Sequence, residues 1–405
     1  MNGTKAQTPK VAIIGAGLTG LLTAHGLKKA GFNVVLFDQE EGLDARVRDW
    51  PISVHWALPN LKSLLSDSAL ADFPQSFTNP HLEYTPEVES MPCINGQTGE
   101  VMLRSAMPGL RRITRQRLRR ILAAEFNAAG AIQWGKQLEK MDVDGEMVRL
   151  IFADGTAAEA NYVLGTDGAS SKARALLFGD DEVARAKPSG LMCATGYPRH
   201  GDPAKVEPVV NLHPLGAVTA GVTSTCGVAV MYVDDPKDMA TWTIAWIKIW
   251  RRSKLPEPPA KKGPEALAYI KATSNDVIEP FRSQIEWTRE TDGCYIDEMR
   301  TWVPVMWETH GGRITLAGDA AHPMLVFRGQ GFQHAVLDAE RYVQALISVR
   351  DGKSKKEEAV QAYTAEVVER GAKAVTQSLS EAELSMDLES VQKMLLAKMG
   401  YARTA

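Results

Sequence analysis

The sequence VAIIGAGLTGLLTAHGLKKAGFNVVLFD, residues 11–38, decides the fold. A short apolar run leads into Gly-x-Gly-x-x-Gly, then a helical stretch, then a second apolar run that ends at Asp38. This order predicts a strand, a tight turn, a helix and a parallel strand, which together begin a doubly wound α/β sheet. Because every element is in register, we interpret the stretch as a dinucleotide-binding unit and not as a simple glycine-rich turn.

The three glycines and the acid each have a physical role in such a unit. Gly15 permits the tight turn, Gly17 lets the backbone approach a pyrophosphate, and Gly20 lets the helix pack close to the strand. The start of the helix offers free N–H groups to phosphates. Asp38 can accept both hydroxyls of a ribose, and its charge disfavours a 2′-phosphate. The predicted ligand is therefore FAD or NAD and not NADP.

Bulk properties exclude several classes of protein. The chain has 405 residues, 44% of them hydrophobic and 23% charged, and a net charge of −3. These values predict a large core, two domains and no nucleic-acid or anionic-membrane partner. The N-terminus lacks an apolar signal segment, and no run of 18 apolar residues occurs, so we expect a cytoplasmic protein without a membrane span. The cysteines lie far apart, so we expect free thiols and no metal site.

Two later stretches repeat the pattern of a strand followed by a polar turn. Residues 161–164 form an apolar run that leads into GTDGASSKAR, and residues 313–317 lead into GDAAHP. A carboxylate at a strand end suits a hydroxyl of a polyol chain. The helix expected from Gly331 onward would stabilise negative charge on a bound ring through its N-terminus.

The remaining segments predict a second sheet and further helices. Residues 241–250 have a period-2 component and predict a strand of a mostly antiparallel sheet, in preference to a membrane-surface helix. A Pro-rich loop at 253–264 precedes an expected helix over about 265–283. Turns are expected at 95–99 and at 154–155. The chain after residue 350 is expected to be helical and charged.

Six arginines lie within residues 111–120. Leu118, Ile121 and Leu122 form an apolar stripe there, while the arginines occupy other faces and no aromatic residue lies between them. We therefore expect a solvated basic helix that contributes one arginine to a phosphate, and no nucleic-acid site.

Three stretches, GAGLTG with Asp38, GTDGASSKAR and GDAAHPMLVFRGQGF, resemble in order and separation the single-component flavin monooxygenases of group A. These are the aromatic hydroxylases known for the p-hydroxybenzoate hydroxylase fold. The resemblance covers residues 11 to about 350. Segments such as DWPISVHWALP and RRITRQRLRRIL are most similar to fungal members from secondary metabolism.

The resemblance implies an α/β fold with a Rossmann-like FAD-binding domain, an interleaved, mostly antiparallel substrate domain and a C-terminal helical segment. The expected boundaries are 9–75, 108–185 and 300–350 for the FAD-binding domain, 76–107 and 186–299 for the substrate domain, and 351–405 for the C-terminal helices.

The resemblance also implies which residues contact FAD. Arg48 and Arg115 match arginines that contact the cofactor, Arg48 at the pyrophosphate. Asp167 belongs to a DG motif that serves both FAD and NAD(P)H, Asp319 would hold the ribityl chain, and backbone groups at 331–333 would face the pyrimidine edge. The residues so assigned are Gly15, Gly17, Leu18, Thr19, Gly20, Asp38, Gln39, Arg48, Arg115, Asp167, Gly168, Gly318, Asp319, Gly331, Phe332 and Gln333.

The expected reaction follows from the same resemblance. NAD(P)H would reduce FAD, O₂ would add at the flavin C4a, and the hydroperoxide would transfer one oxygen atom to a bulky aromatic polyketide or alkaloid, by hydroxylation or epoxidation. Deprotonation of a phenol or indole would enrich the ring, and His55, His213 and Tyr232 are candidate bases. A monomer or a homodimer is expected.

Two departures from the family pattern keep other functions open. Val326 and Gln333 stand where members usually carry proline and asparagine. Proline would stiffen that loop. A redox-neutral FAD-containing cyclase or isomerase is therefore one alternative, and a non-catalytic flavin-bearing binding protein is another. An NAD-dependent dehydrogenase is disfavoured, because the GD motif would have no purpose there.

Overall fold

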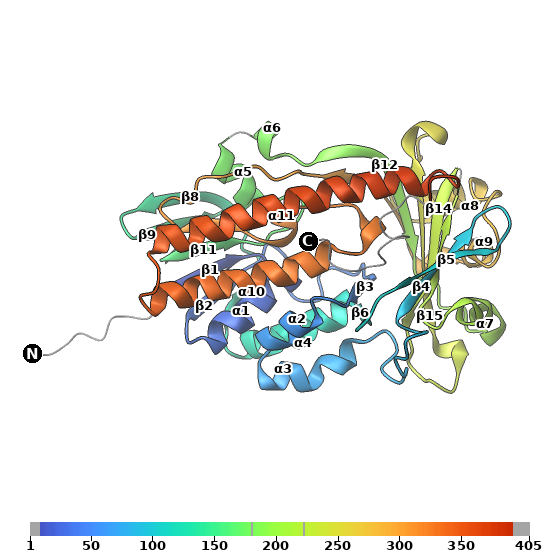
Figure 1. Ribbon diagram of the computed structural model, residues 1–405, viewed down its shortest axis with the longest axis horizontal. Helices are drawn as coiled ribbons and strands as arrows, with labels where there is room; N and C mark the ends of the chain where they lie inside the picture. The colour runs from blue at the N-terminus through green and yellow to red at the C-terminus, as the bar shows by residue number, and fades with distance from the viewer. Residues whose placement is uncertain (1–8, 180, 222, 392–405) are drawn as a thin grey trace, which may run out of the picture.

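The computed structural model describes residues 9–179, 181–221 and 223–391. Within these residues the chain builds a five-stranded parallel sheet and a seven-stranded mixed sheet at opposite ends of an elongated molecule. The long helix α11 (Lys356–Ser385) runs from one sheet to the other (Figure 1).

The parallel sheet has the order β17-β11-β1-β2-β7. Its central strand pairs with both neighbours in parallel, so that Ile14 lies between Phe37 and Gly165. Since these strands end at the same edge, the turns that follow them gather there. The strands are β1 (Lys10–Ile14), β2 (Asn33–Phe37), β7 (Ile132–Gln133), β11 (Tyr162–Gly165) and β17 (Ile314–Leu316). The predicted Rossmann-like α/β fold is confirmed.

Helices and two small sheets surround this parallel sheet. Helix α1 packs against α4 and α10, and their apolar faces form one core with the sheet. The helices are α1 (Leu18–Lys29), α2 (Leu58–Leu64), α3 (Asp67–Asp72), α4 (Arg115–Ala128), α5 (Lys172–Phe178), α6 (Asp181–Ala184) and α10 (Gly331–Arg350). The small sheets contain β3 (Pro51–Val54) with β6 (Arg111–Thr114), and β8 (Leu138–Asp144), β9 (Met147–Phe152) and β10 (Ala157–Ala160).

The seven-stranded sheet has the order β16-β12-β15-β14-β13-β4-β5 and is antiparallel except between β13 and β4. One of its faces carries Trp250 and Ile244 against α8 and α9, and the other carries Ile247 and Ile249 toward the interior. The strand expected at 241–250 is thus present as β15. The elements are β4 (Ser90–Asn95), β5 (Val101–Ala106), β12 (Lys187–Gly196), β13 (Ala217–Ala220), β14 (Ser224–Tyr232), β15 (Thr243–Arg251), β16 (Cys294–Thr301), α7 (Pro203–Leu212), α8 (Pro264–Ala272) and α9 (Phe281–Glu286).

The predicted basic helix at 111–120 is partly wrong. Its first four residues form strand β6, and α4 begins only at Arg115. The arginines are also less solvated than expected, because Arg111 pairs with Glu89 and Arg119 is only 3% exposed. Carboxylates supplied by distant segments account for this difference.

The single helix expected over 265–283 is also wrong, because the chain forms α8 and α9 with an irregular stretch between them. Pro280 is the N-cap of α9. Proline disfavours helical backbone at the residue before it, so a continuous helix could not pass through Glu279 into α9. The short helices α2 and α3 were not predicted.

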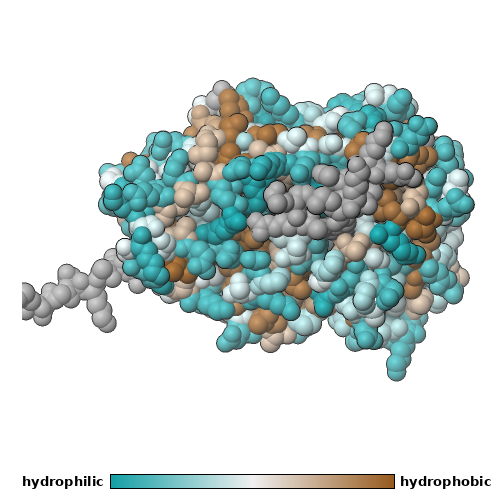
Figure 2. Space-filling view, in the orientation of Figure 1, coloured by the Kyte–Doolittle hydropathy of each residue, from teal (hydrophilic) through white to brown (hydrophobic). Residues whose placement is uncertain are grey.

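Short 3₁₀ turns complete the chain: η1 (Phe73–Ser76), η2 (Met239–Thr241), η3 (Arg252–Lys254), η4 (Glu290–Asp292), η5 (Gly318–Ala320) and η6 (Val326–Arg328). The expected C-terminal helices are represented by α11, and residues 392–405 lie outside the described residues. In the described ranges, no helix is both long and apolar enough to cross a membrane. The face shown in Figure 2 is mostly hydrophilic, with apolar residues in small separate patches.

Candidate active site

A cavity of about 1300 Å³ begins at the carboxyl edge of the parallel sheet and reaches the inner face of the seven-stranded sheet. Most residues predicted for the cofactor line it, although they come from distant parts of the sequence. They are Gly15, Gly17, Leu18, Thr19, Asp38, Gln39, Arg48, Arg115, Asp167, Gly168, Asp319, Gly331 and Phe332.

The glycine-rich turn after β1 has the geometry that its sequence predicts. Gly15 has a φ of 104°, and a Cβ there would lie 2.6 Å from the Thr166 carbonyl oxygen. A Cβ at Gly20 would lie 2.1 Å from the Gly15 carbonyl oxygen. By contrast, a Cβ at Gly17 would meet no protein atom within 4 Å. Gly15 and Gly20 are therefore required by packing, whereas Gly17 leaves open space toward the cavity.

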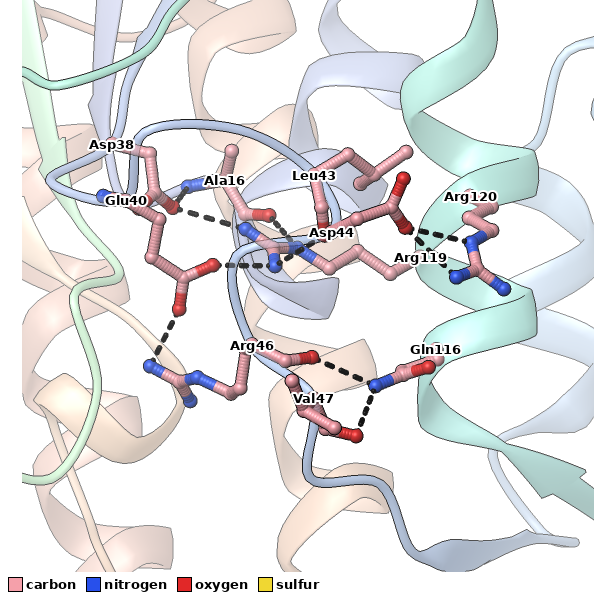
Figure 3. A network of polar contacts seen from close by, with 10 residues as sticks. All are labelled: Ala16, Asp38, Glu40, Leu43, Asp44, Arg46, Val47, Gln116, Arg119 and Arg120. Atoms are coloured by element: carbon pink, nitrogen blue, oxygen red, sulfur yellow. Dashed lines mark hydrogen bonds and ion pairs between the residues drawn. The ribbon is translucent and has the colours of Figure 1, made fainter.

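Asp38, at the end of β2, is held by protein groups. Its Oδ2 accepts the backbone N–H of Ala16 at 2.7 Å and its Oδ1 accepts that of Glu40 at 2.9 Å. The Arg119 guanidinium bridges Asp38, at 3.4 Å, and Glu40, at 2.6 Å, as Figure 3 shows. Oδ2 accepts from both Ala16 and Arg119, whereas Oδ1 accepts only from Glu40 and keeps a second lone pair, so Asp38 can still accept a hydroxyl from the cavity that it lines.

Arg119 was missed by the sequence analysis. It lies four residues after Arg115 and is buried beside Leu118 and Leu122 on α4. Besides its two carboxylate partners it donates from Nε to the Ala16 carbonyl at 2.8 Å. Arg119 therefore fixes the glycine-rich turn to α4. The sequence analysis placed all six arginines outside the apolar stripe, whereas Arg119 lies among the buried positions of α4.

Arg115, at the start of α4, has the carboxylates of Asp49 and Glu40 nearby but forms no ion pair with a described residue. Its Nη1 is buried and has no hydrogen-bond partner among the described residues, and its guanidinium lies 5.1 Å from the Trp50 ring. Burial, helped by Arg46 and Arg119, lowers the pKa of Arg115 to about 10. An unpartnered guanidinium in the cavity wall near the glycine-rich turn fits a bound phosphate.

Asp167 and Asp319 have different environments although both end strands of the parallel sheet. The Asp167 carboxylate accepts the backbone N–H groups of Lys172 and Ala173 at 2.7 and 3.0 Å, so it caps α5. Asp319 opens onto the cavity within the body of the protein, and burial raises its pKa. Asp319 is therefore the carboxylate left free for a hydroxyl of a bound ligand.

A buried charge network supports the turn that carries Asp319. Asp338 on α10 pairs with His322 at 2.7 Å and with Arg370 on α11 at 2.6 Å. Arg370 also meets His334 Nδ1 at 2.9 Å. Asp338 and Arg370 were missed by the sequence analysis, because helical charge patterns are common and nothing local marks these two.

Gln333 has a structural role that the resemblance did not imply. Its side-chain Oε1 accepts the backbone N–H groups of His55 and Ala57, both at 3.2 Å, and its Nε2 donates to the Ser53 carbonyl at 2.9 Å. Gln333 is fully buried and does not line the cavity. Neither do the packed glycines Gly20 and Gly318.

None of the three candidate bases lines the cavity. The ring of His213 contacts the Glu87 carbonyl through Nε2 at 3.2 Å and accepts from the backbone N–H of Leu215 at Nδ1. Tyr232 donates a hydrogen bond to Asp49. His55 is 3% exposed, and burial lowers its pKa to about 4. The geometry therefore argues against all three, since a base must reach the substrate proton.

The far end of the cavity is mostly apolar. Its wall is the inner face of the seven-stranded sheet, completed by the loop before α10 and by the end of α11. Apolar and weakly polar residues dominate this wall: Met91, Met107, Cys193, Val228, Ala245, Ile247, Ile249, Met299, Leu325, Val326, Phe327 and Val391. Such a surface suits a large apolar molecule.

Comparisons with known proteins agree with this arrangement. Residues 81–378 match the FAD binding domain family, and residues 13–61 match the NAD(P)-binding Rossmann-like domain family. The chain is 29% identical to the FAD-dependent monooxygenase phnB of Penicillium herquei over 402 residues, which cover 98% of this chain and 96% of phnB. It is 30% identical to the FAD-dependent monooxygenase cctM of Talaromyces islandicus over 374 residues, 91% of each chain.

A solved structure shares the fold. The structure of HpxO from Klebsiella pneumoniae complexed with FAD and uric acid superimposes with a TM-score of 0.73 and 18% identity, covering 98% of this chain and 93% of HpxO. The open space at Gly17 and the unpartnered Arg115 fit the FAD that the family binds. The chain thus belongs to the FAD binding domain family and is an FAD-dependent monooxygenase of group A, similar to fungal members.

Proposed function

We propose that the protein uses NAD(P)H and O₂ to hydroxylate or epoxidise a bulky aromatic polyketide or alkaloid of secondary metabolism. The observation that carries this proposal is the shape of the cavity. One space of about 1300 Å³ joins the glycine-rich turn to the apolar face of the seven-stranded sheet. The residues expected to hold FAD line only the first part of this space, which would leave room for a large second molecule beside the cofactor.

Bound FAD would accept a hydride from NAD(P)H and, once reduced, would activate O₂. The chain's own residues would supply binding and position. Backbone N–H groups at Gly17 and the Arg115 guanidinium would hold the pyrophosphate, and Asp319 would accept a hydroxyl of the ribityl chain. Helix α10 begins at Gly331, and Gly331 and Phe332 both line the cavity, so the positive end of this helix lies at the cavity wall.

The sheet face would exclude water from the reacting ring. Tyr197 and Thr195 line this wall with a few other polar side chains, such as Thr219 and Thr225, and most of the remaining side chains are apolar. A water-poor pocket strengthens electrostatic contacts with the substrate and protects reactive species from water.

The first test is the visible spectrum of the purified protein without oxygen, before and after NADPH and then NADH. We expect the flavin bands to bleach with at least one of the two nucleotides. Bands that persist with both, even with aromatic ligands present, would contradict the proposal and favour the redox-neutral alternative. An Arg115→Gln variant loaded with excess FAD, compared with Arg120→Gln on the exposed face of α4, would separate loss of cofactor from loss of reduction.

A further inference from the structure

The loop of residues 324–330, between η5 and α10, forms the part of the cavity wall next to the start of α10. One residue of this loop behaves differently from its neighbours. Arg328 does not line the cavity and is only 2% exposed, so its side chain points away from the cavity and into the protein. The residues of the loop that do line the cavity are Met324, Leu325, Val326, Phe327, Gly329 and Gln330.

Helix α11, which lies along α10 and packs on η6, holds this loop through buried polar contacts (Figure 1). Arg328 Nη1 lies 3.4 Å from Glu381 Oε1, and both side chains are buried. Ser378 Oγ accepts the backbone N–H of Leu325 at 3.2 Å, and Ser378 is fully buried. Leu325 also shares a buried apolar cluster with Ala382. The loop is therefore attached to α11 by an ion pair, a hydrogen bond and apolar packing.

The same side of α11 supports a second part of the cavity wall. Arg370 pairs with Asp338 behind the turn that presents Asp319. Glu381 follows Arg370 by about three helical turns, so the two charged side chains leave the helix in nearly the same direction. Helix α11 thus holds the Asp319 turn with a cation and the loop with an anion.

The Arg328–Glu381 pair defines where the loop lies more than it adds stability. A buried ion pair contributes little net free energy compared with apolar residues of the same size, because both charges lose their hydration. Removal of one partner is strongly unfavourable, since the other charge stays buried. Without the Glu381 carboxylate, the Arg328 guanidinium would gain hydration by moving outward, and the loop would move with it.

The backbone of this loop could also be stiffened by proline, which family members usually carry where this chain has Val326. Leu325 has φ −74° and ψ 155°, the extended conformation that a following proline favours. Val326 is the first residue of the turn η6, a position that tolerates proline, and its side chain is half-exposed. Proline would therefore fit at residue 326 of this chain.

We propose that Glu381 is a positioning residue, which acts through Arg328 to hold the loop of residues 324–330 against the flavin site. The ion pair would give this chain the stiffness that proline gives elsewhere. The loop leads directly into Gly331 and Phe332, where the flavin ring is expected. The consequence for catalysis rests on the proposed function, because a loop held in place keeps water away from the reacting ring.

The test uses trypsin, because Arg328 itself reports the position of the loop. Trypsin cleaves after an arginine only when the surrounding chain opens. The FAD-loaded full chain is compared with Glu381→Gln and with the double variant Glu381→Gln/Val326→Pro. Glu383→Gln is the matched control, because Glu383 pairs with Arg251 at the surface of the same helix. Mass spectrometry identifies each cleavage site, and quenching of flavin fluorescence by iodide measures access of solvent to the flavin.

We expect Glu381→Gln to be cleaved after Arg328 about tenfold or more faster than the wild type, because the buried guanidinium loses its anion. Cleavage after Arg341, in the middle of α10, reports general unfolding and should stay unchanged. Iodide quenching should rise about twofold or more, as local opening exposes the flavin. Both effects should be absent in Glu383→Gln. The added proline should restore most of the protection, because it restricts the backbone of the open loop.

Ser378→Ala is a second, milder variant, for use if Glu381→Gln does not fold. It removes only the acceptor of the Leu325 N–H and should raise cleavage after Arg328 severalfold.

Three results would overturn the inference: equal cleavage after Arg328 in the wild type and the loop variants, equally increased cleavage after Arg341, or a proline that restores neither protection nor shielding from iodide. Bleaching by NADPH without oxygen is recorded on the same preparations. A protein whose loop responds as expected but whose flavin is not reduced would refute the monooxygenase proposal and leave the role of Glu381 intact.

Discussion

Asp338 accepts the backbone N–H of Gly318 at 2.7 Å with the same oxygen that meets His322. Its other oxygen accepts from Arg370 on α11. Asp338 is fully buried on α10, so the turn that presents Asp319 to the cavity is held from behind by two helices. The position of this turn therefore depends on two contacts of Asp338. One is with Gly318, 20 residues earlier in the sequence, and the other is with Arg370, 32 residues later.

Asp338→Ala should strongly destabilise the protein. The substitution leaves Arg370, His322 and one backbone N–H without their acceptor in a buried place, which costs about 3–5 kcal/mol. Urea unfolding of the FAD-loaded protein at pH 7 measures the change. Asp351→Ala is the control, because Asp351 pairs with Arg350 at the surface and should change the free energy of unfolding by only about 0.5 kcal/mol. Equal effects in the two variants would contradict the role given to Asp338.

Two buried histidines should make stability fall in mild acid. Burial lowers the pKa of His55 to about 4 and that of His334 to about 2, whereas an unfolded histidine titrates near 6.5. Below that value the unfolded chain binds protons that the folded chain does not. The free energy of unfolding should therefore drop as pH falls from about 6.5 to 4, by up to about 1.4 kcal/mol per pH unit for each histidine.

The variant His55→Gln tests this pH dependence. Between about pH 6.5 and 4, this variant should reduce the slope of the unfolding free energy against pH by up to about 1.4 kcal/mol per pH unit. His81→Gln, at an exposed position, is the control and should leave the slope unchanged. The comparison of slopes is informative even if His55→Gln is less stable at every pH. An unchanged slope would show that His55 is protonated in the folded state.

Local sequence was sufficient for the parts of the fold that depend on local spacing. The glycine-rich turn, the acid at the end of β2, and the polar turns after β11 and β17 each occupy a few consecutive residues. The residue types alone predict these turns, because a positive φ or a close approach of the backbone requires glycine. The parallel strands then bring these turns to one edge, which explains why most predicted cofactor residues share one cavity.

The parts that could not be predicted depend on partners far away in the sequence. Arg119 is buried because Asp38 and Glu40 meet it from segments about 80 residues earlier. The hydroxyl of the candidate base Tyr232 donates a hydrogen bond to Asp49, which lies 183 residues earlier in the sequence. A sequence shows which side chains can bind a proton, but the direction in which a strand or loop points them is set by the tertiary fold.

Two glycines of the same motif should respond differently to alanine. Gly17→Ala adds a methyl group where no protein atom lies within 4 Å, so the stability of the apoprotein should change by less than about 1 kcal/mol. FAD affinity should fall at least tenfold, because the methyl group occupies the space left for the pyrophosphate. Gly20→Ala should destabilise the apoprotein itself, since its Cβ would lie 2.1 Å from the Gly15 carbonyl. Thermal unfolding of the apoprotein and titration with FAD measure the two effects. Equal FAD affinity of Gly17→Ala and the wild type would show that the pyrophosphate does not lie against the backbone at Gly17.

Arg115→Gln should weaken FAD binding without weakening the apoprotein. The wild-type guanidinium lies beside Arg46 and Arg119 without a hydrogen-bond acceptor for Nη1. Asp49 and Glu40 oppose the loss of its charge, but burial dominates and lowers the pKa of Arg115, so removal of the charge should not destabilise the apoprotein. With FAD present, the same removal deletes a charge-assisted contact worth about 1.5–3 kcal/mol, or roughly 10- to 100-fold in affinity. The control Arg120→Gln removes an exposed arginine that pairs with Asp44 from the same helix. Equal FAD affinity in both variants would place the pyrophosphate away from Arg115, whereas a loss of apoprotein stability in Arg115→Gln alone would mean that this guanidinium has a structural partner within the protein.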